Sequence, residues 1–396
     1  MDPIANPYAP GAGSPPPELA GRDDIRETVR IALERIRRGL STKSVLMVGL
    51  RGVGKTVLLD RMRDDAEATG IHTLRIEAPE GRSLPSLLAP QLRQALLRLS
   101  RNEKSKDTAQ RALRALAGFA KALKVKYHDI ELGYDYEPEP GLADNGDLEH
   151  DLQALLETVG TAAQRADTAL VMFVDELQYV PDQELAILIT ALHRCAQRRL
   201  PITLLGAGLP QLRGQMGNAK SYAERLFEFP GIGPLTPDAA TQALRKPAEA
   251  EHVLYDDAAV VDILTATHGY PYFLQEWGKH AWDIAQHSPI TLADTQAASC
   301  SALAALDESF FRVRFDRLTP NEKKYLRAMA ELGPGPHRSS DISAALHRPV
   351  TALGPTRSQL IAKGMIWSPN HGDTAFTVPL FDAFMKRIWP DDSWRP

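Results

Sequence analysis

The sequence predicts an α/β fold built on a parallel β-sheet, and three segments support this prediction. Residues 44–48 (SVLMV), 169–174 (ALVMFV) and 201–208 (PITLLGAG) are nearly continuous apolar stretches. Segments with helical periodicity lie between them. Strands without a polar face are typical of parallel sheets that helices cover on both sides, so we expect strands and helices to alternate in a layered core.

Length and charge bound the number of domains and the class of protein. The chain has 396 residues, a net charge of -4 and 24% charged residues. This length suits about three compact units. The balanced charge argues against a protein that binds polyanions over its whole surface, so any nucleic-acid interface is expected to be local.

Cysteine usage and the first residues bear on location. Cys195 and Cys300 lie far apart without metal-ligand spacing, which fits a reducing compartment. Residues 1–18 are rich in proline and glycine, where a signal peptide would have a basic end and an apolar run, and no apolar window has the length of a membrane span. We therefore expect a cytoplasmic protein without a membrane partner.

Residues 19–235 are expected to form the core. Apolar spacing predicts helices over 22–40, 57–67, 147–167 and 183–198 and a further strand over 71–76. The part near 83–147 is interpreted as an insertion, with helices over 84–99 and 108–123 and then a short hairpin or loop.

Two smaller units are expected after the core. Residues 236–316 have a helical pattern that is interrupted at Gly269 and Pro271 and resumes over 292–315. Residues 317–396 contain three short helical segments and a hairpin with a polar tip. This order is typical of a winged helix-turn-helix.

Residues 49–56 (GLRGVGKT) satisfy the pattern GxxxxGKT between an apolar strand and a helix. Glycines allow successive backbone N–H groups to face inward, where a phosphate accepts from them at the positive end of the helix. Lys55 adds a charge for the terminal phosphates and Thr56 a hydroxyl for Mg²⁺. The alternative is a glycine-rich turn with an incidental lysine, and a second motif argues against it.

That second motif is a pair of acids after the strand 169–174. Asp175 can reach Mg²⁺ directly or through water, and Glu176 is placed to orient and deprotonate an attacking water. A solvated acid pair at the end of a strand is the alternative. Together with the phosphate loop, the pair predicts hydrolysis of ATP rather than kinase chemistry.

The chain resembles the AAA+ and STAND branches of the P-loop ATPases, in particular the origin-recognition-like (archaeal-ATPase-like) group with a C-terminal winged helix. The resemblance spans nearly the whole chain and rests on LAGRDDI, GLRGVGKT, MFVDEL, AERLFEF, HGYPYFL and the tail. It implies a P-loop core, a helical lid, and ATP or ADP with Mg²⁺ as ligands. It places at the nucleotide Gly49, Arg51, Gly52, Val53, Gly54, Lys55, Thr56 and Val57, and at the metal Thr56 and Asp175.

The resemblance also assigns roles outside the two motifs. Gly21 and Arg22 would lie near the adenine, and Pro271 would pack near the base from the lid. Arg225 falls where the family has its arginine finger, which acts within a subunit or on a neighbour after self-association. The alternatives are a solvated Arg22 before a helix and a surface salt bridge between Arg225 and Glu228.

Two positions depart from the family pattern. Gly206 and Gly208 end the strand where a polar residue such as asparagine is usual, which leaves Thr203 or Gln211 as substitutes. Tyr272 stands where many AAA+ members have a lid arginine. These departures resemble the STAND pattern and imply slow hydrolysis.

The tail predicts a local nucleic-acid interface. Ten lysines and arginines stand against seven acids over 319–396. In its third helical segment Thr351 is expected to cap the helix, and Leu353, Leu360 and Ile361 to face inward. Arg357, Ser358 and Lys363 would then face a DNA major groove, so duplex DNA is the expected partner of residues 351–371, with a protein as the alternative.

We therefore expect an ATP-binding, slowly hydrolysing switch that couples nucleotide state to DNA binding. The alternative is an ATP-dependent scaffold whose winged helix holds a protein partner. A GTPase is disfavoured because no (N/T)KxD motif, which reads guanine, follows the acid pair.

Overall fold

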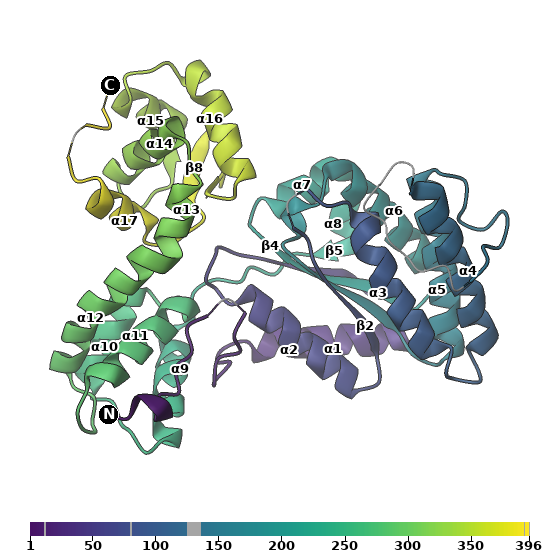
Figure 1. The fold of residues 1–396 in the computed structure, drawn as a ribbon, viewed down its shortest axis with the longest axis horizontal. Helices are drawn as coiled ribbons and strands as arrows, with labels where there is room; N and C mark the ends of the chain where they lie inside the picture. The colour runs from purple at the N-terminus through teal and green to yellow at the C-terminus, as the bar shows by residue number, and fades with distance from the viewer. Residues whose placement is uncertain (12, 80, 125–135, 392, 396) are drawn as a thin grey trace.

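A five-stranded sheet organises the first part of the molecule (Figure 1). The computed structural model describes residues 1–11, 13–79, 81–124, 136–391 and 393–395. All neighbouring strands run parallel, in the order β2-β3-β4-β1-β5. The strands are β1 (Ser44–Val48), β2 (His72–Glu77), β3 (Leu170–Asp175), β4 (Ile202–Gly208) and β5 (Phe227–Glu228). The expected α/β fold is confirmed.

Helices cover both faces of this sheet, which explains why its central strands have no polar side. On one face α1 (Asp23–Arg37) and α2 (Lys55–Ala68) pack on Met47, Val171 and Phe173. On the other face the strands pack against α3 (Leu84–Leu99), α4 (Lys106–Leu123), α5 (Leu148–Arg165) and α6 (Asp182–Gln197). The core ends with α7 (Leu212–Ala219) and α8 (Ala223–Leu226).

The region near 83–147 is an integral part of the core. Helices α3 and α4 bury Leu92, Leu96 and Phe119 in the same hydrophobic cluster as the sheet. They match the two helices expected from the sequence. The hairpin or loop expected after them falls largely on 125–135, outside the described residues.

Four helices form the lid, namely α9 (Pro237–Ala250), α10 (Asp257–Thr267), α11 (Pro271–Ile284) and α12 (Leu292–Leu306). The last of them continues through a π-helical turn, Asp307–Phe311, into α13 (Arg312–Asp316). In this turn the Arg312 N–H donates to the carbonyl of Asp307, five residues earlier. The helix expected over 292–315 is present. At this turn its hydrogen bond spans five residues, one more than in an α-helix.

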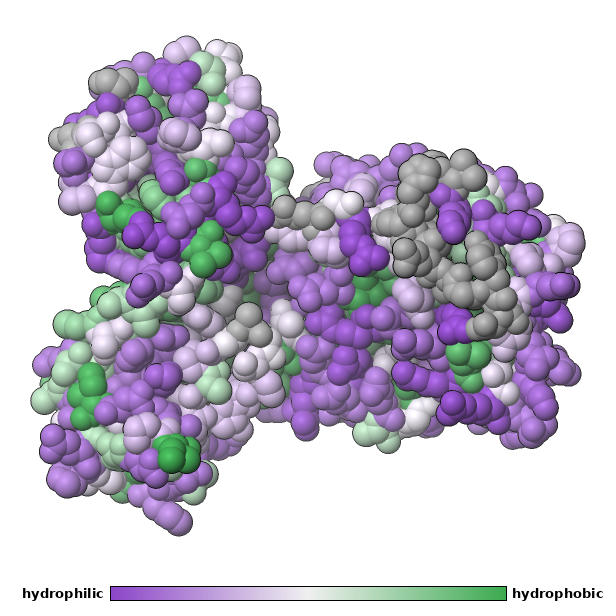
Figure 2. All heavy atoms as spheres, viewed as in Figure 1, coloured by the Kyte–Doolittle hydropathy of each residue, from purple (hydrophilic) through white to green (hydrophobic). Residues whose placement is uncertain are grey.

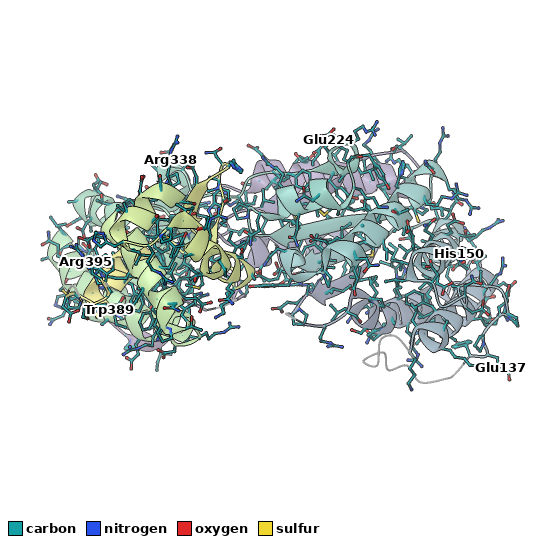
Figure 3. All side chains as sticks on the ribbon, turned by 90° about the horizontal axis from the view of Figure 1, so that it is seen from above. Glu137, His150, Glu224, Arg338, Trp389 and Arg395 are labelled. Carbon is teal, nitrogen blue, oxygen red and sulfur yellow. The ribbon has the colours of Figure 1, made fainter. Side chains whose placement is uncertain are left out.

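The C-terminal unit has three helices followed by an antiparallel hairpin. Its elements are α14 (Pro320–Glu331), β6 (His337–Arg338), α15 (Ser339–Ala345), α16 (Val350–Ala362), β7 (Ile366–Trp367), β8 (Asp373–Phe376) and α17 (Phe381–Ile388), with the strand order β6-β8-β7. The expected cap at Thr351 is wrong, because α16 begins at Val350 and its N-cap is Pro349. Figure 3 shows Arg338 and Trp389 on this unit and His150 at the far end of the core.

The lid and the C-terminal unit share one hydrophobic cluster, separate from the two clusters of the core. Phe311 of the π turn stacks on Phe384 of α17 with ring centroids 5.2 Å apart and meets Phe381 edge to face. The two units therefore form one body, and the core forms another. Figure 2 shows both with a largely hydrophilic surface on which hydrophobic residues are scattered. Among the described helices, none has the length and apolar character to cross a membrane.

Candidate nucleotide site

A cavity of about 420 Å³ lies between the core and the lid. The phosphate loop, the first residues of the chain, the start of α11 and the π turn with α13 contribute to its wall. The expected site residues that line it are Arg22, Arg51, Gly52, Val53, Gly54, Lys55, Thr56, Val57, Glu176 and Pro271. The structure thus brings together residues that are up to about 250 positions apart in the sequence.

The phosphate loop has the backbone geometry that its glycines allow. Gly52 and Gly54 have φ angles of 80° and 83°, in the left-handed region. A Cβ atom on Gly49 would lie 2.1 Å from the carbonyl oxygen of Ile232, so only glycine fits against that strand end. Helix α2 begins at Lys55, directly after the loop. Its N-terminal N–H groups and positive dipole end therefore face the cavity, as phosphate binding requires.

Lys55 is buried at the base of the loop, with 7% of its surface exposed. Its ammonium donates to the carbonyls of Gly49 at 3.0 Å and Leu50 at 2.9 Å. Burial lowers the pKa of Lys55 to about 8, opposed by the negative charges of Glu176 and Asp175. Gly49 and Leu50 belong to the phosphate loop itself. Their carbonyls therefore hold the Lys55 ammonium at the loop, where a terminal phosphate would bind.

The two acids after β3 have different environments. Asp175 is buried, accepts from the backbone N–H of Glu176 at 2.9 Å and forms an ion pair with Arg75 at 3.5 Å. Glu176 lines the cavity with a φ of 51°, which is unusual for a residue other than glycine and turns the chain sharply after β3. Its carboxylate lies 3.7 Å from Arg51. Glu176 is therefore the acid of the pair that faces the cavity.

Gln178, in the short 3-10 turn Leu177–Tyr179, was not anticipated as a site residue. Its amide group donates to the Glu176 carboxylate, and its oxygen accepts from the Leu209 N–H at 3.1 Å. It therefore joins the cavity acid to the end of β4. A sequence signal existed, since a glutamine two residues after the acid pair can fold back on it, but many solvated glutamines have the same spacing.

The glycines of β4 have a packing reason. A Cβ atom on Gly208 would lie 2.7 Å from the Gln178 side-chain oxygen, and one on Gly206 would lie 2.6 Å from Leu46. Gln178 thus occupies the space in which a polar side chain from β4 would otherwise reach the site. Thr203 bonds Ser44 at the opposite end of the sheet, at 3.0 Å. Neither Thr203 nor Gln211 is among the described residues that line the cavity, so neither is a substitute.

The residues expected at Mg²⁺ fit a metal that the nucleotide itself helps to hold. The Thr56 side chain lines the cavity, and Asp175 ends a strand at the same edge of the sheet as the phosphate loop. A hydroxyl and a carboxylate are oxygen donors of the kind Mg²⁺ prefers, with phosphate oxygens and water as its other ligands. Among the described residues, no group of three or more acids, histidines and cysteines could hold an ion by itself. The fit is therefore to a nucleotide-bound ion, which would neutralise charge on the phosphates.

Of the residues expected near the base, Arg22 and Pro271 line the cavity and Gly21 does not. The Arg22 guanidinium donates to the carbonyl of Gly233 at 2.5 Å, and its burial lowers its pKa. Gly21 has a φ of 66°, and a Cβ atom there would lie 2.6 Å from Ala239 of α9. Gly21 therefore allows the backbone at this position to pack closely against α9 of the lid.

Arg225 lies away from the phosphate loop of its own chain. It lies two residues before β5, whose Phe227 pairs with Ser44 at the start of β1, whereas the loop follows the end of β1. Four residues of strand rise about 13 Å. Arg225 is exposed, as is its neighbour Glu224, which Figure 3 shows at the outer edge of the core. The geometry therefore argues against an arginine finger within one subunit, and a role toward a second copy stays a prediction.

Arg314 of α13 is a cavity residue that sequence reasoning missed. It stacks on the ring of Phe310, with its guanidinium carbon 4.1 Å from the centroid, and donates to the Phe310 carbonyl. Burial, aided by the positive charge of Arg51, lowers the pKa of Arg314 to about 10. The lid arginine is absent at Tyr272, yet a cation reaches the cavity from the next helix. The extra residue of the π turn, which no local sequence signal revealed, places it there.

The C-terminal unit touches the phosphate loop directly. The Arg51 backbone N–H donates to the carbonyl of Thr377 at 3.0 Å, and the Arg51 side chain donates to the Tyr179 hydroxyl at 2.9 Å. On the lid side the Tyr272 N–H donates to the carbonyl of Gly52 at 3.1 Å. One body of the molecule is thus bonded to two residues of the loop that belongs to the other.

Two family models match parts of the sequence. Residues 18–205 match the AAA ATPase domain, and residues 308–385 match a domain of unknown function (DUF8462). No curated protein matches the chain. The first match contains both the phosphate loop and the acid pair.

Several solved structures are similar to this chain at low sequence identity. A Walker-type ATPase of Pyrococcus abyssi is similar over 93% of this chain and 96% of its own, with 16% identity and a TM-score of 0.57. The Aeropyrum pernix Orc1 protein, solved in complex with DNA, is similar over 94% of each chain with 14% identity and a TM-score of 0.47. The RuvB Holliday junction branch migration motor of Thermotoga maritima has 17% identity and a TM-score of 0.43 over 92% of this chain and 96% of its own. The match of residues 18–205 to the AAA ATPase domain, together with the phosphate loop and the acid pair that it contains, supports ATP hydrolysis by this protein.

Proposed function

We propose that the protein is a slowly hydrolysing molecular switch in which bound ATP changes how the lid and the C-terminal unit sit on the core. The observation that carries this proposal is the position of Arg51. Its backbone N–H is bonded to Thr377 of the C-terminal unit, while its side chain lies 3.7 Å from Glu176. A phosphate that attracts the Arg51 side chain would compete with both the acid and the C-terminal contact.

In this proposal each cavity residue has a distinct task. Lys55 and the N–H groups of the loop hold the phosphates, and Thr56 and Asp175 hold the ion. Glu176 takes a proton from the attacking water after it leaves its contacts with Arg51 and Gln178. These restraints on the acid support slow turnover, because hydrolysis has to wait for Glu176 to be released.

In this proposal Arg314 binds the terminal phosphate and so distinguishes ATP from ADP. It lies on the helix that joins the lid to the C-terminal unit, and its neighbour Phe311 packs on Phe381 and Phe384. A phosphate that pulls on Arg314 would therefore move the aromatic contact as well. ATP and ADP differ by this one phosphate, which gives the two states different C-terminal positions.

ATP binding by the purified protein and by Lys55→Ala tests the site. Removal of a buried charged hydrogen-bond donor costs about 1.5–3 kcal/mol, so we expect affinity to fall by roughly ten- to a hundredfold in a calorimetric titration. Lys43→Ala serves as the control, because Lys43 donates to the Glu224 carbonyl at 3.4 Å, near the start of β1 and remote from the phosphate loop. Equal affinities in the parent protein and Lys55→Ala would overturn the assignment.

For the partner of the C-terminal unit, the geometry favours a protein over duplex DNA. Arg357 of α16 is turned onto the hairpin, where it donates to the Thr374 hydroxyl at 3.0 Å and the Asp373 carbonyl at 3.1 Å. Lys363 donates to Glu322 at 2.7 Å. Both cations expected to face a major groove are thus engaged within the unit. The exposed positions of α16 have no charge: Val350, Thr351, Ala352, Pro355, Ser358, Gln359 and Ala362.

Duplex binding decides between the two partners. We expect the ATP-bound protein to give no gel shift with a mixed-sequence duplex at low salt, where nucleic-acid binding is strongest. A shift that weakens steeply with added salt would instead support DNA as the partner. Loss of that shift in Arg338→Ala, an exposed cation beside β8, would locate the contact at the hairpin.

A further inference from the structure

The first residues of the chain form a strap, described over residues 2–11 and 13–20, that is fastened to the lid. The Trp282 indole N–H donates to the Asp2 carbonyl at 2.9 Å, and the Asn6 amide donates to the Lys279 carbonyl at 3.1 Å. The Ala9 N–H donates to the Gln275 side-chain oxygen at 3.3 Å. These three lid partners all lie on α11, so the start of the strap follows one helix of the lid (Figure 1).

Tyr8 is the main anchor of the strap. Its ring is 4% exposed and belongs to the hydrophobic cluster of the lid, and its hydroxyl donates to the Leu244 carbonyl of α9 at 2.5 Å. The ring lies on Gly278 of α11. A Cβ atom on Gly278 would lie 2.7, 2.8 and 2.9 Å from three ring atoms, which is closer than any real contact. The ring therefore stays in this place only because residue 278 has no side chain.

After Tyr8 the strap crosses from the lid to the core along the cavity. Its lining residues extend from Ala9 to Ala20. A Cβ atom on Gly13 would lie 3.9 Å from the Thr56 methyl group, so the strap passes in contact distance of the phosphate loop. Glu18 pairs with Lys246 of the lid at 2.8 Å. The strap then joins the core just before α1.

We propose that this strap is the outer wall of the nucleotide site, which encloses the base and ribose and slows their release. The proposal rests on the proposed ATP-binding function. The phosphate loop takes the charged part of the ligand, and the strap offers apolar residues to the remaining part: Pro10, Pro16, Leu19 and Ala20. Because Tyr8 ties the strap to the lid, a bound nucleotide leaves only after the strap detaches or the two bodies separate.

Gly278→Ala tests this proposal without touching the cavity. The added methyl group occupies the space of the Tyr8 ring, while alanine is the better helix former, so α11 keeps its stability. We expect radiolabelled ATP, chased with unlabelled ATP, to leave the full-length variant roughly tenfold faster or more, with a smaller change in the association rate. Limited proteolysis should cut the strap of the variant and spare that of the parent protein.

Gly214→Ala is the matched control, because it adds the same methyl group to α7, where no described atom lies within 4 Å of its Cβ position. It should release ATP at the parent rate. Tyr8→Ala removes the anchor itself. If protease does not cut the strap of Gly278→Ala, ATP release is measured in Tyr8→Ala instead. Parent-like release from a variant whose strap is cut would overturn the strap proposal alone. Absence of ATP binding in the parent protein would instead overturn the proposed function.

Discussion

At the residue scale, the ammonium of Lys55 makes nucleotide binding depend on pH. Burial lowers the pKa of Lys55 to about 8 in the free protein, and a bound phosphate stabilises the charged form. Affinity should therefore stay level below about pH 8 and fall above it, by up to about tenfold per pH unit, because binding then requires uptake of a proton.

ATP titrations between about pH 7 and pH 9.5 measure this dependence. Lys55→Arg is the control, because a guanidinium stays charged over the whole range, and its residual affinity should not fall with pH. A level profile in the parent protein would show that Lys55 is charged in the free state throughout, contrary to its buried environment.

Glu176→Gln separates binding from chemistry. The amide keeps the size of the side chain and loses the ability to accept a proton from water. We expect nearly unchanged ATP affinity and a loss of roughly a hundredfold or more in turnover, measured as released phosphate. Glu228→Gln, at an exposed position on β5, should retain parent turnover. Equal turnover in Glu176→Gln and the parent would remove Glu176 from its assigned role.

The sequence predicted the residues whose chemistry is tied to a local motif. Residues 51–57 of the phosphate loop and helix start, Arg22, Pro271 and Glu176 line one cavity. Gln178 and Arg314 were missed because the tertiary fold brings each of them to the site. Gln178 fills the space next to Gly208, and Arg314 reaches the cavity from α13, outside the core. The distance of Arg225 from the phosphate loop of its own chain could not be predicted either, since a motif gives no distance.

At the element scale, the π turn before α13 aims a cation at the cavity. Arg314→Ala should weaken ATP by roughly ten- to a hundredfold and ADP less, because a buried charge-assisted bond contributes about 1.5–3 kcal/mol and ADP lacks the terminal phosphate. Competition titrations with both nucleotides measure the ratio. Arg312→Ala, an exposed position on the same helix, is the control. Equal losses for ATP and ADP would show that Arg314 does not distinguish the two.

Most elements were predictable because their apolar periodicity is strong. The strands of the sheet and the helices of the core have the expected positions within a few residues. The N-cap of α16 was predicted wrongly. The helix begins at Val350, directly after Pro349, so Thr351 lies inside its first turn. The π turn was not recognised, because the helix after it, Arg312–Asp316, is too short to reveal the shift in apolar spacing that one added residue causes.

At the scale of the whole molecule, the lid and the C-terminal unit were expected as two separate units after the core. The shared cluster around Phe311 and Phe384 joins them, so the boundary that can open lies between this body and the core. The bonds across this boundary include Arg51 to Thr377 and Tyr272 to Gly52. Nucleotide should therefore act on the joint between the two bodies.

Hydrogen exchange measures this joint directly. With ATP in a Glu176→Gln background we expect faster exchange at Arg51, whose amide is bonded to Thr377 in the structure, and unchanged exchange inside α14. The same protein with ADP should stay close to the nucleotide-free pattern. Identical exchange in all three states would exclude the C-terminal contact from the switch.

The π turn also affects how the link between the cavity and the C-terminal unit through Arg314 can be gained or lost. Its backbone contains a single residue beyond the α-helical repeat, and each residue of a helix turns the chain by about 100°. Deletion of one residue between Asp307 and Phe311 would therefore swing Arg314 away from the phosphates and also rotate the C-terminal unit. Loss or gain of one codon is thus enough to disconnect or create this link, and it also changes the packing of Phe311 on Phe381 and Phe384.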